Sequence, residues 1–198
     1  ARGTQAGQAT DAREIVPRVL RDALGIPLYR SEDLLALFQA HAPLWVVATE
    51  SDADRIGAPF WKAERQVGID PDQRITYTQL TFTRFHDQIL TQLNYIVWFP
   101  ARPKPSPLDL YGGLLDGITY RVTLDRRGDP LLHETIHNCG CYYTAFPSPR
   151  LKTRESIDYA EPPLIVAAPE ADPATELMTV VLAAGTHQVV GLSATARA

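Results

Sequence analysis

Cysteine is scarce in this chain: only two of its 198 residues are cysteines, Cys139 and Cys141, and a single glycine separates them. Two cysteines so close in sequence cannot link distant loops, which excludes a small scaffold held together by disulfides. An excess of basic residues is also lacking, because 19 Lys and Arg stand against 23 Asp and Glu, for a formal net charge of −4. Without a basic field, we expect no nucleic-acid partner.

Long apolar runs are absent as well. No segment approaches the roughly 20 consecutive apolar residues that a membrane-spanning helix needs, so no membrane span is predicted. The chain begins Ala1-Arg2-Gly3-Thr4 without an initiator methionine. A removed signal peptide would produce such a beginning, and so would a cloned fragment. The compartment therefore stays open, with an inclination toward a secreted or periplasmic location.

The overall composition is that of an ordinary globular protein, with 45% hydrophobic and 21% charged residues. A chain of this length can build one domain with a substantial core. Residues 1–10 are rich in Gly, Gln and Thr and are expected to be disordered. We therefore predict a single domain over residues 11–198.

Helical patterns occupy the first part of that domain, residues 11–43. Apolar residues recur at helical spacing from Asp11 to Leu24, ending at Gly25, with Pro17 placed where a first turn tolerates proline. A second helix is indicated by Ser31 as its N-cap and by the apolar residues that follow, and it should end before Pro43.

From residue 44 onward the patterns are mainly those of β-strands. Residues 75–85 and 89–99 are rich in Thr, aromatic and β-branched residues and are separated by three polar ones, which predicts a long antiparallel hairpin. Residues 118–124 alternate apolar and polar side chains, as a half-buried strand does. Residues 44–49, 164–166 and 177–183 are shorter strand candidates. Residues 50–73 are expected to be loop, with Phe60 and Trp61 as anchors. The predicted fold class is α+β, mostly antiparallel β-sheet with two N-terminal helices.

Reactive side chains concentrate in one segment, residues 130–143. It contains His133, Glu134, His137, Cys139 and Cys141, and no other segment gathers so many groups that can bind a metal or move a proton. On a helix, the two histidines would lie one turn apart on the same face. Asp129 and Pro130 suit the start of a helix, and Gly140 suits its end.

In that helical form the string His133-Glu134-Thr135-Ile136-His137 resembles the zincin metallopeptidases, whose motif is H-E-x-x-H on a helix. The resemblance implies a zinc cofactor held by His133 and His137, with Glu134 as the general base that activates a zinc-bound water. It implies hydrolysis of a peptide or small-molecule ligand that the sequence does not identify. One zincin branch has a third histidine where Tyr143 stands here.

A strand is the other geometry for this segment. Residues 125–128 have the pattern of a type I turn with a bulge, which joins antiparallel strands, so residues 131–143 would be a return strand. Alternation then puts His133, His137, Cys139 and Cys141 on one face and Glu134 on the other. Two imidazoles and two thiols suit zinc, but a strand is too extended for more than residues 137–141 to close on one ion.

Three functional hypotheses follow from these geometries. The first is a zinc-dependent hydrolase that uses His133, Glu134 and His137. The second is a metal- or redox-responsive domain built on His137, Cys139 and Cys141. The third is a non-enzymatic extracytoplasmic β-rich binding or structural domain, in which the two cysteines form a core pair or a strained, reducible disulfide. His187, beside a turn at Gly185, is a candidate for a distant third metal ligand.

Overall fold

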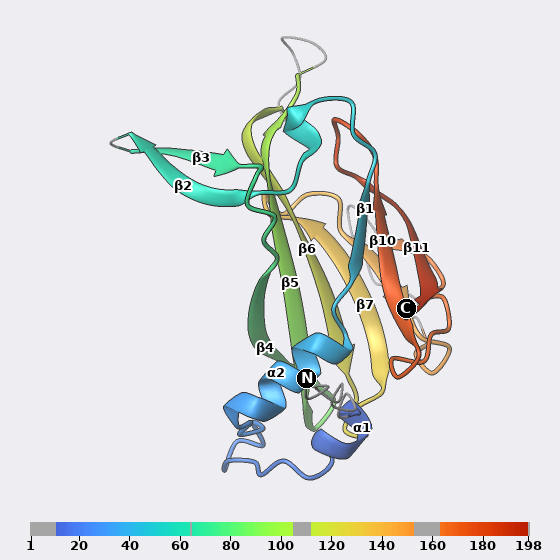
Figure 1. Ribbon diagram of the computed structural model, residues 1–198. Helices are drawn as coiled ribbons and strands as arrows, with labels where there is room; N and C mark the ends of the chain where they lie inside the picture. Colours follow the sequence, from blue (N-terminus) through green and yellow to red (C-terminus); the bar gives the residue numbers. More distant parts are fainter. Residues whose placement is uncertain (1–10, 64, 105–111, 153–162, 198) are drawn as a thin grey trace, which may run out of the picture.

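The computed structural model describes residues 11–63, 65–104, 112–152 and 163–197 (Figure 1), so the expected disordered segment 1–10 lies outside the described residues. Its elements, in chain order, are α1 (Ala12–Ile15), α2 (Ser31–Ala40), β1 (Leu44–Val47), the short 3-10 helix η1 (Asp52–Asp54), β2 (Ala58–Ala63), β3 (Gln66–Asp70), β4 (Tyr77–Phe85), β5 (Gln88–Arg102), β6 (Gly113–Leu124), β7 (Pro130–His137), β8 (Thr144–Pro147), β9 (Leu164–Ile165), β10 (Glu176–Leu182) and β11 (Val189–Ala196).

The strands form two main sheets and a separate hairpin. The larger sheet has six strands in the order β4-β5-β6-β7-β8-β9, and its neighbours are antiparallel except for the parallel pair β8 and β9. The smaller sheet has the order β1-β10-β11, with β1 parallel and β11 antiparallel to β10. Strands β2 and β3 pair only with each other and project from the upper end of the molecule in Figure 1.

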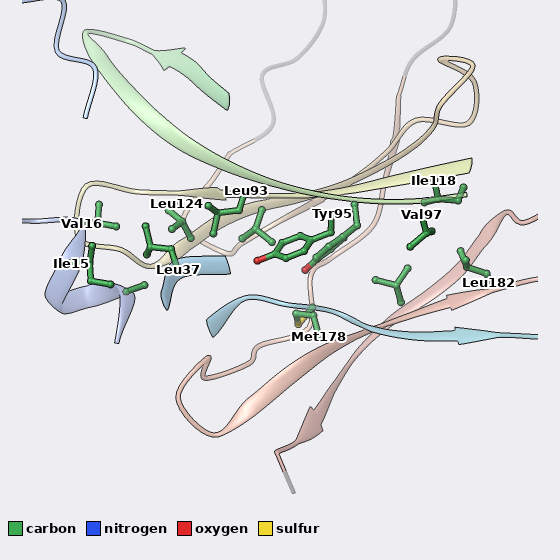
Figure 2. Packing of buried hydrophobic residues seen from close by; sticks show 14 of the residues in the cluster. Ile15, Val16, Leu37, Leu93, Tyr95, Val97, Ile118, Leu124, Met178 and Leu182 are labelled. Atoms are coloured by element: carbon green, nitrogen blue, oxygen red, sulfur yellow. The ribbon is translucent and has the colours of Figure 1, made fainter. Parts of the chain in front are cut away.

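The hydrophobic core fills the space between the two sheets, as Figure 2 shows. Every second residue of β5, β6 and β10 points into it, as one-sided burial of a strand requires. Helices α1 and α2 add side chains at one end. The buried members of the core are Ala12, Ile15, Val16, Leu37, Leu93, Tyr95, Val97, Phe99, Ile118, Tyr120, Val122, Leu124, Met178, Val180 and Leu182.

The first predicted helix is far shorter than its apolar spacing indicated. Helix α1 covers only Ala12–Ile15, and its last helical hydrogen bond runs from the N–H of Val16 to the carbonyl of Ala12. Pro17 follows, which has no N–H to donate and whose ring crowds the carbonyl four residues back, so the helix ends there. Leu20 and Leu24, expected on a buried stripe, are 78% and 76% exposed.

The loop predicted for residues 50–73, with Phe60 and Trp61 as anchors, differs from the structure. The segment contains η1 and the β2–β3 hairpin, in which Phe60 and Trp61 are 44% and 75% exposed. The hairpin was missed because Pro59 and Gly68 interrupt its alternating pattern.

The coarser fold prediction is confirmed. The described part of the chain is mainly β, its sheets are mostly antiparallel, and its two α-helices lie near the N-terminus. Helix α2 matches its prediction, except that Ser31 is its first helical residue and Arg30 is the N-cap, without a side-chain hydrogen bond. The long hairpin is confirmed as β4 and β5. Among the described helices, none is long and apolar enough to cross a membrane.

Helix α2 provides a direct test of how firmly the helical end belongs to the core. Leu37 is fully buried, whereas Leu35 on the same helix is 60% exposed. We expect Leu37→Asp to lower the free energy of unfolding by about 3 kcal/mol or more, because a carboxylate replaces a packed isobutyl group. Leu35→Asp, the matched control, should change it by less than about 1 kcal/mol. Urea denaturation measures both; equal effects would show that α2 is not part of the cooperative unit.

Candidate functional site

Residues 131–137 form a strand, so the strand alternative is confirmed for this segment and the helical one is wrong. Strand β7 pairs with β6 on one side and β8 on the other. Four residues of strand separate His133 from His137 by about 13 Å, so the two imidazoles do not share an ion as they would on one helical turn. The geometry of the zincin motif is therefore not the geometry of this segment.

Glu134 lies on the opposite face of β7 from the two histidines. Its carboxylate is buried, accepts a 2.7 Å hydrogen bond from the Tyr143 hydroxyl and lies 3.6 Å from the Arg121 guanidinium. Arg121 in turn donates to the Asn94 side chain at 2.7 Å. Glu134 is thus the acceptor in a polar network on the outer face of the larger sheet. It does not face the side chains of His133 and His137.

The network that contains Glu134 closes into a ring across four strands. Asn94 donates to Thr81, Thr81 to Gln92, Gln92 to Thr123 and Thr123 to Glu134, with Arg121 completing the ring. Each polar side chain on this buried patch therefore has a partner, which offsets the cost of its burial. This explains why amides occur within the otherwise apolar β4–β5 hairpin.

A second polar cluster lies on the core side, and we call Asp54, Asp116, His137 and His187 the buried His–Asp chain. The Nδ1 atom of His187 is 2.8 Å from one oxygen of Asp116, and Nδ1 of His137 is 3.3 Å from the other. The Nε2 atom of His187 lies 3.2 Å from Oδ1 of Asp54, although it is not aligned for a hydrogen bond. None of the four residues is more than 8% exposed.

Local structure holds the two aspartates in place. Asp54 ends η1 and closes a capping box with Ser51, accepting the backbone N–H groups of Glu50 and Ser51, and its other oxygen accepts the N–H of Gly185. Asp116 accepts the N–H of the next residue, Gly117. His187 has a positive φ of 51° in the turn between β10 and β11 and stacks on Phe99, with ring centroids 4.0 Å apart.

These contacts favour the charged form of both carboxylates. For Asp116, burial opposes ionisation most strongly, but hydrogen bonds from His137, His187 and Gly117 together with the charge of His137 outweigh it and lower the pKa. For Asp54, burial again acts against ionisation, and the N–H groups of Gly185, Glu50 and Ser51 overcome it, so its pKa also lies below the ordinary value. The buried His–Asp chain therefore keeps both of its carboxylates in the charged form inside the protein.

The two cysteines lie just beyond β7, in a turn that joins it to β8. We call residues 138–142 the cysteine turn. Gly140 has a φ of +89°, the left-handed region that favours glycine, and Tyr142 has a φ of +54°. The N–H of His137 donates to the Cys141 carbonyl at 3.0 Å, and the N–H of Gly140 donates to the His137 carbonyl at 2.7 Å. The strand face predicted for Cys139 and Cys141 is therefore not formed.

Both cysteines are free thiols in the structure. Cys139 is exposed and Cys141 is partly exposed. A hydrogen bond to the Cys139 side chain and burial raise the pKa of Cys141. The cysteines are therefore neither core residues nor isolated surface residues, and the core-pair interpretation is wrong.

The turn is attached closely to the buried His–Asp chain. The N–H of Asn138 donates to the Gly117 carbonyl at 2.8 Å, and the Asn138 side chain accepts from Thr119 at 2.8 Å. Its amide group packs directly over Gly117, where an added Cβ atom would lie only 2.2 Å from it. The Tyr142 ring lies 5.0 Å from that of His137. These contacts attach the cysteine turn to β6 and to the His137 ring.

At the other end of β7, His133 belongs to a different environment. Its Nδ1 atom is 2.7 Å from the hydroxyl of Tyr120, deep in the core, and its ring stacks on the Tyr120 ring. Burial lowers the pKa of His133 to about 4 and raises that of Tyr120. Because the phenol keeps its proton, it donates to Nδ1, and the remaining proton of the neutral imidazole is on Nε2.

The structure thus distributes the five predicted site residues over three places. His137 belongs to the buried His–Asp chain next to Cys139 and Cys141, Glu134 lies on the outer face of the sheet, and His133 lies by Tyr120. Among the described residues, no group of three His, Cys, Asp or Glu side chains converges as it must to hold a metal ion. Zinc binding by His137, Cys139 and Cys141 stays a prediction.

Sequence reasoning missed Asp54 and Asp116 and named His187 only as a distant ligand. One available signal was Asp116 itself. It is the single carboxylate on the face of β6 that points into the core, and the other buried side chains of that face are apolar. Another was Ser51 three residues before Asp54, the spacing of a capping box.

Comparisons of the chain with protein-family models, with curated proteins and with solved structures gave no match.

Proposed function

We propose that this protein carries out thiol–disulfide exchange with Cys139 and Cys141 as its reacting groups. The observation that supports the proposal is the pair of free thiols, two residues apart in a tight turn, of which Cys139 is exposed and Cys141 is partly exposed. A buried pair would be unreactive, and two distant thiols would not act in sequence. These are the only cysteines in the chain, so no other thiol competes with them.

The two thiols have different roles in this proposal. Cys139 is the more exposed of the two. The raised pKa of Cys141 keeps its thiol protonated at pH values at which an ordinary thiol begins to ionise. Cys139 as thiolate attacks a sulfur of a substrate disulfide, forming a mixed disulfide and releasing one substrate thiolate. Cys141 then loses its proton and attacks Cys139. The products are the Cys139–Cys141 disulfide and the second substrate thiol, so the substrate gains the two electrons that the protein loses.

Oxidation of the two thiols closes a ring through the Cys139–Cys141 disulfide. The strain in that ring determines whether the protein oxidises or reduces its substrates. A disulfide across a single intervening residue forms a very small and strained ring, and strain makes a disulfide more easily reduced. The cysteine turn is fixed by backbone hydrogen bonds to His137 and Gly117, so it cannot relax freely. The oxidised protein is therefore expected to donate its disulfide to dithiol substrates.

The reduction potential tests the proposal. We expect equilibration with defined ratios of reduced and oxidised glutathione to give a potential above about −230 mV, in the range of catalytic disulfides. Cys139→Ser should abolish exchange with a model disulfide. Cys141→Ser should instead accumulate a mixed disulfide at Cys139, detectable by mass spectrometry, because the second thiol that resolves it is missing. A pair that glutathione cannot oxidise, or equal behaviour of the two variants, would contradict the proposal.

Zinc binding at the same turn is a second candidate, and the orientation of His137 favours it. Its Nδ1 atom faces Asp116, while its Nε2 atom is buried without a hydrogen-bond partner among the described residues. A carboxylate on one imidazole nitrogen commonly orients the other toward a metal. The candidate requires the turn to bring both thiolates to Nε2. Zinc protection of both thiols against alkylation, lost in His137→Gln, would support it, while unchanged alkylation rates would exclude it.

A further inference from the structure

Strand β4 is an open edge of the larger sheet. It stands first in the order β4-β5-β6-β7-β8-β9, and no other described strand pairs with its outer side (Figure 1). It is nine residues long, and its pairing with β5 continues without a bulge. Proteins usually protect such an edge with proline, lysine, bulges or short strands. Strand β4 has none of these, and its one charged residue is Arg84. The edge is therefore suited to pairing with another strand.

The backbone groups at this edge belong to the even-numbered residues of β4. Phe85 and Gln88 flank the two-residue turn of the β4–β5 hairpin, and residues that flank such a turn bond to each other through the backbone. Because these bonds alternate along an antiparallel pair, the odd-numbered residues of β4 bond to β5. The Trp98 carbonyl of β5 accepts from Gly57 on the β4 side, which fits the same alternation. Residues 78, 80, 82 and 84 are left with N–H and C=O groups at the open edge.

The side chains of β4 follow a similar order in both directions from Thr81. One residue away on either side they are apolar, two away polar and uncharged, three away polar, and four away aromatic. Two β4 strands that pair antiparallel about a twofold axis at Thr81 therefore place like side chains opposite each other. Even-numbered residues then meet even-numbered residues, so the open backbone groups bond to each other. The opposed positions are Leu80 with Phe82, Gln79 with Thr83, Thr78 with Arg84 and Tyr77 with Phe85.

Other positions of the twofold axis match the side chains less well. An axis at Leu80 or at Phe82 keeps the open backbone groups opposite each other. With the axis at Phe82, however, the apolar Leu80 lies opposite the charged Arg84. With the axis at Leu80, the aromatic ring of Phe82 lies opposite Thr78. The axis at Thr81 sets apolar residues against apolar ones and keeps the two arginines apart, so it defines the favoured register.

We propose that β4 pairs with β4 of a second copy of this chain about a twofold axis at Thr81, so that the two larger sheets become one continuous sheet. The pairing covers Tyr77 and Phe85, which are 39% and 42% exposed. It uses the open edge of both copies, so the assembly closes at two. An interface built mainly from two strands is small, and we expect a micromolar dissociation constant. Strands β5 and β6 separate β4 from β7, so the cysteine turn stays accessible and its proposed role is independent of the dimer.

The unmodified protein provides the first test. Sedimentation equilibrium should show a mass that rises with protein concentration from 21.9 kDa to twice that value and no further. Amide hydrogen exchange followed by NMR should show that the N–H groups of Leu80 and Phe82 become protected as the dimer forms. Those of Gln79 and Thr81 should be protected at every concentration, because they bond to β5. A protein that stays monomeric at millimolar concentration, or a dimer in which Leu80 and Phe82 exchange as fast as in the monomer, would overturn the proposal.

Two substitutions at one exposed position test the register. Thr78 lies opposite Arg84 of the partner subunit in the proposed pairing, and it does so twice in the dimer. Thr78→Glu should therefore lower the dissociation constant about fivefold at low salt, and Thr78→Lys should raise it about fivefold. The overall charge of −4 would favour the opposite order, because added glutamates increase the repulsion between copies. The double variant Thr78→Lys, Arg84→Glu should restore the affinity. Equal or reversed effects of the two single variants, each confirmed as folded by its thermal unfolding, would contradict the proposed pairing.

Discussion

Asp116→Asn is expected to destabilise this protein by about 3 kcal/mol, because a buried hydrogen-bonding group is left without its charged partner. Asp116 holds His137 and His187 with its two oxygens and accepts the N–H of Gly117, and it is only 8% exposed. An asparagine has nearly the same shape, but its amide nitrogen cannot accept a hydrogen bond from an imidazole. One histidine therefore loses its partner and the carboxylate charge disappears from the interior.

Urea unfolding monitored by tryptophan fluorescence measures this loss. Asp87→Asn is the matched control, since Asp87 is exposed in the turn between β4 and β5. It should shift the free energy of unfolding by less than about 0.5 kcal/mol. If Asp116→Asn were as stable as the control, the buried His–Asp chain would not contribute to the fold. The accumulation of the mixed disulfide described for Cys141→Ser can be measured in the same Asp116→Asn background, to show whether the support of the cysteine turn has shifted.

Acid is expected to destabilise the protein in a window well above the ordinary pKa of its carboxylates. The pKa values of His41 and His133 lie at about 3 and about 4, against 6.5 for an ordinary histidine. Burial is the main cause for both. Above pH 6.5 both rings are neutral in the folded and the unfolded chain, and stability is fully present. As the pH falls below 6.5, the unfolded chain binds protons that the folded chain cannot, so stability decreases with falling pH.

The expected size of this loss of stability follows from the two protons that the unfolded chain binds, one at His41 and one at His133. Each contributes at most about 1.4 kcal/mol per pH unit, and less near pH 6.5 and near its folded-state pKa, so the free energy of unfolding should fall by about 5 kcal/mol between pH 6.5 and pH 4. His41→Gln should remove about half of the slope, whereas His86→Gln, at an exposed turn, should leave it unchanged. Urea titrations at half-unit steps of pH give the slope directly. A free energy of unfolding that is constant over this range would show that the two imidazoles take up protons in the folded protein.

The parts of the fold that the sequence predicted well are those set by neighbouring residues. The β4–β5 hairpin and β6 show alternation over many residues, and short turns connect β4 to β5 and β6 to β7. The turn before β7 was recognisable from Asp125 to Gly128, and Gly128 indeed has a φ of +88°. Helix α1 shows where this reasoning failed, because apolar spacing was given more weight than the missing N–H of Pro17.

The candidate site was less predictable because its members come from distant parts of the chain. Asp116 and His187 are 71 residues apart in sequence and are joined only because β6 and the β10–β11 turn meet across the core. No spacing rule for helices or strands connects such a pair. The segment 133–141 was recognised as chemically unusual, but its residues lie on two faces of β7 and in a turn. Their roles depend on Asp54, Asp116 and Tyr120, which the local pattern does not contain.

The parallel pairing of β1 with β10 has a consequence for the order in which the protein assembles. Leu44 pairs with Thr179 and Val47 with Leu182, so two segments about 135 residues apart must meet before the smaller sheet exists. Closing so long a loop is entropically costly and slows folding. On the ribosome, the apolar faces of β5 and β6 emerge long before β10 can cover them. During that interval the nascent chain presents Leu93, Val97 and Val122 to solvent, and it is then most in need of a chaperone.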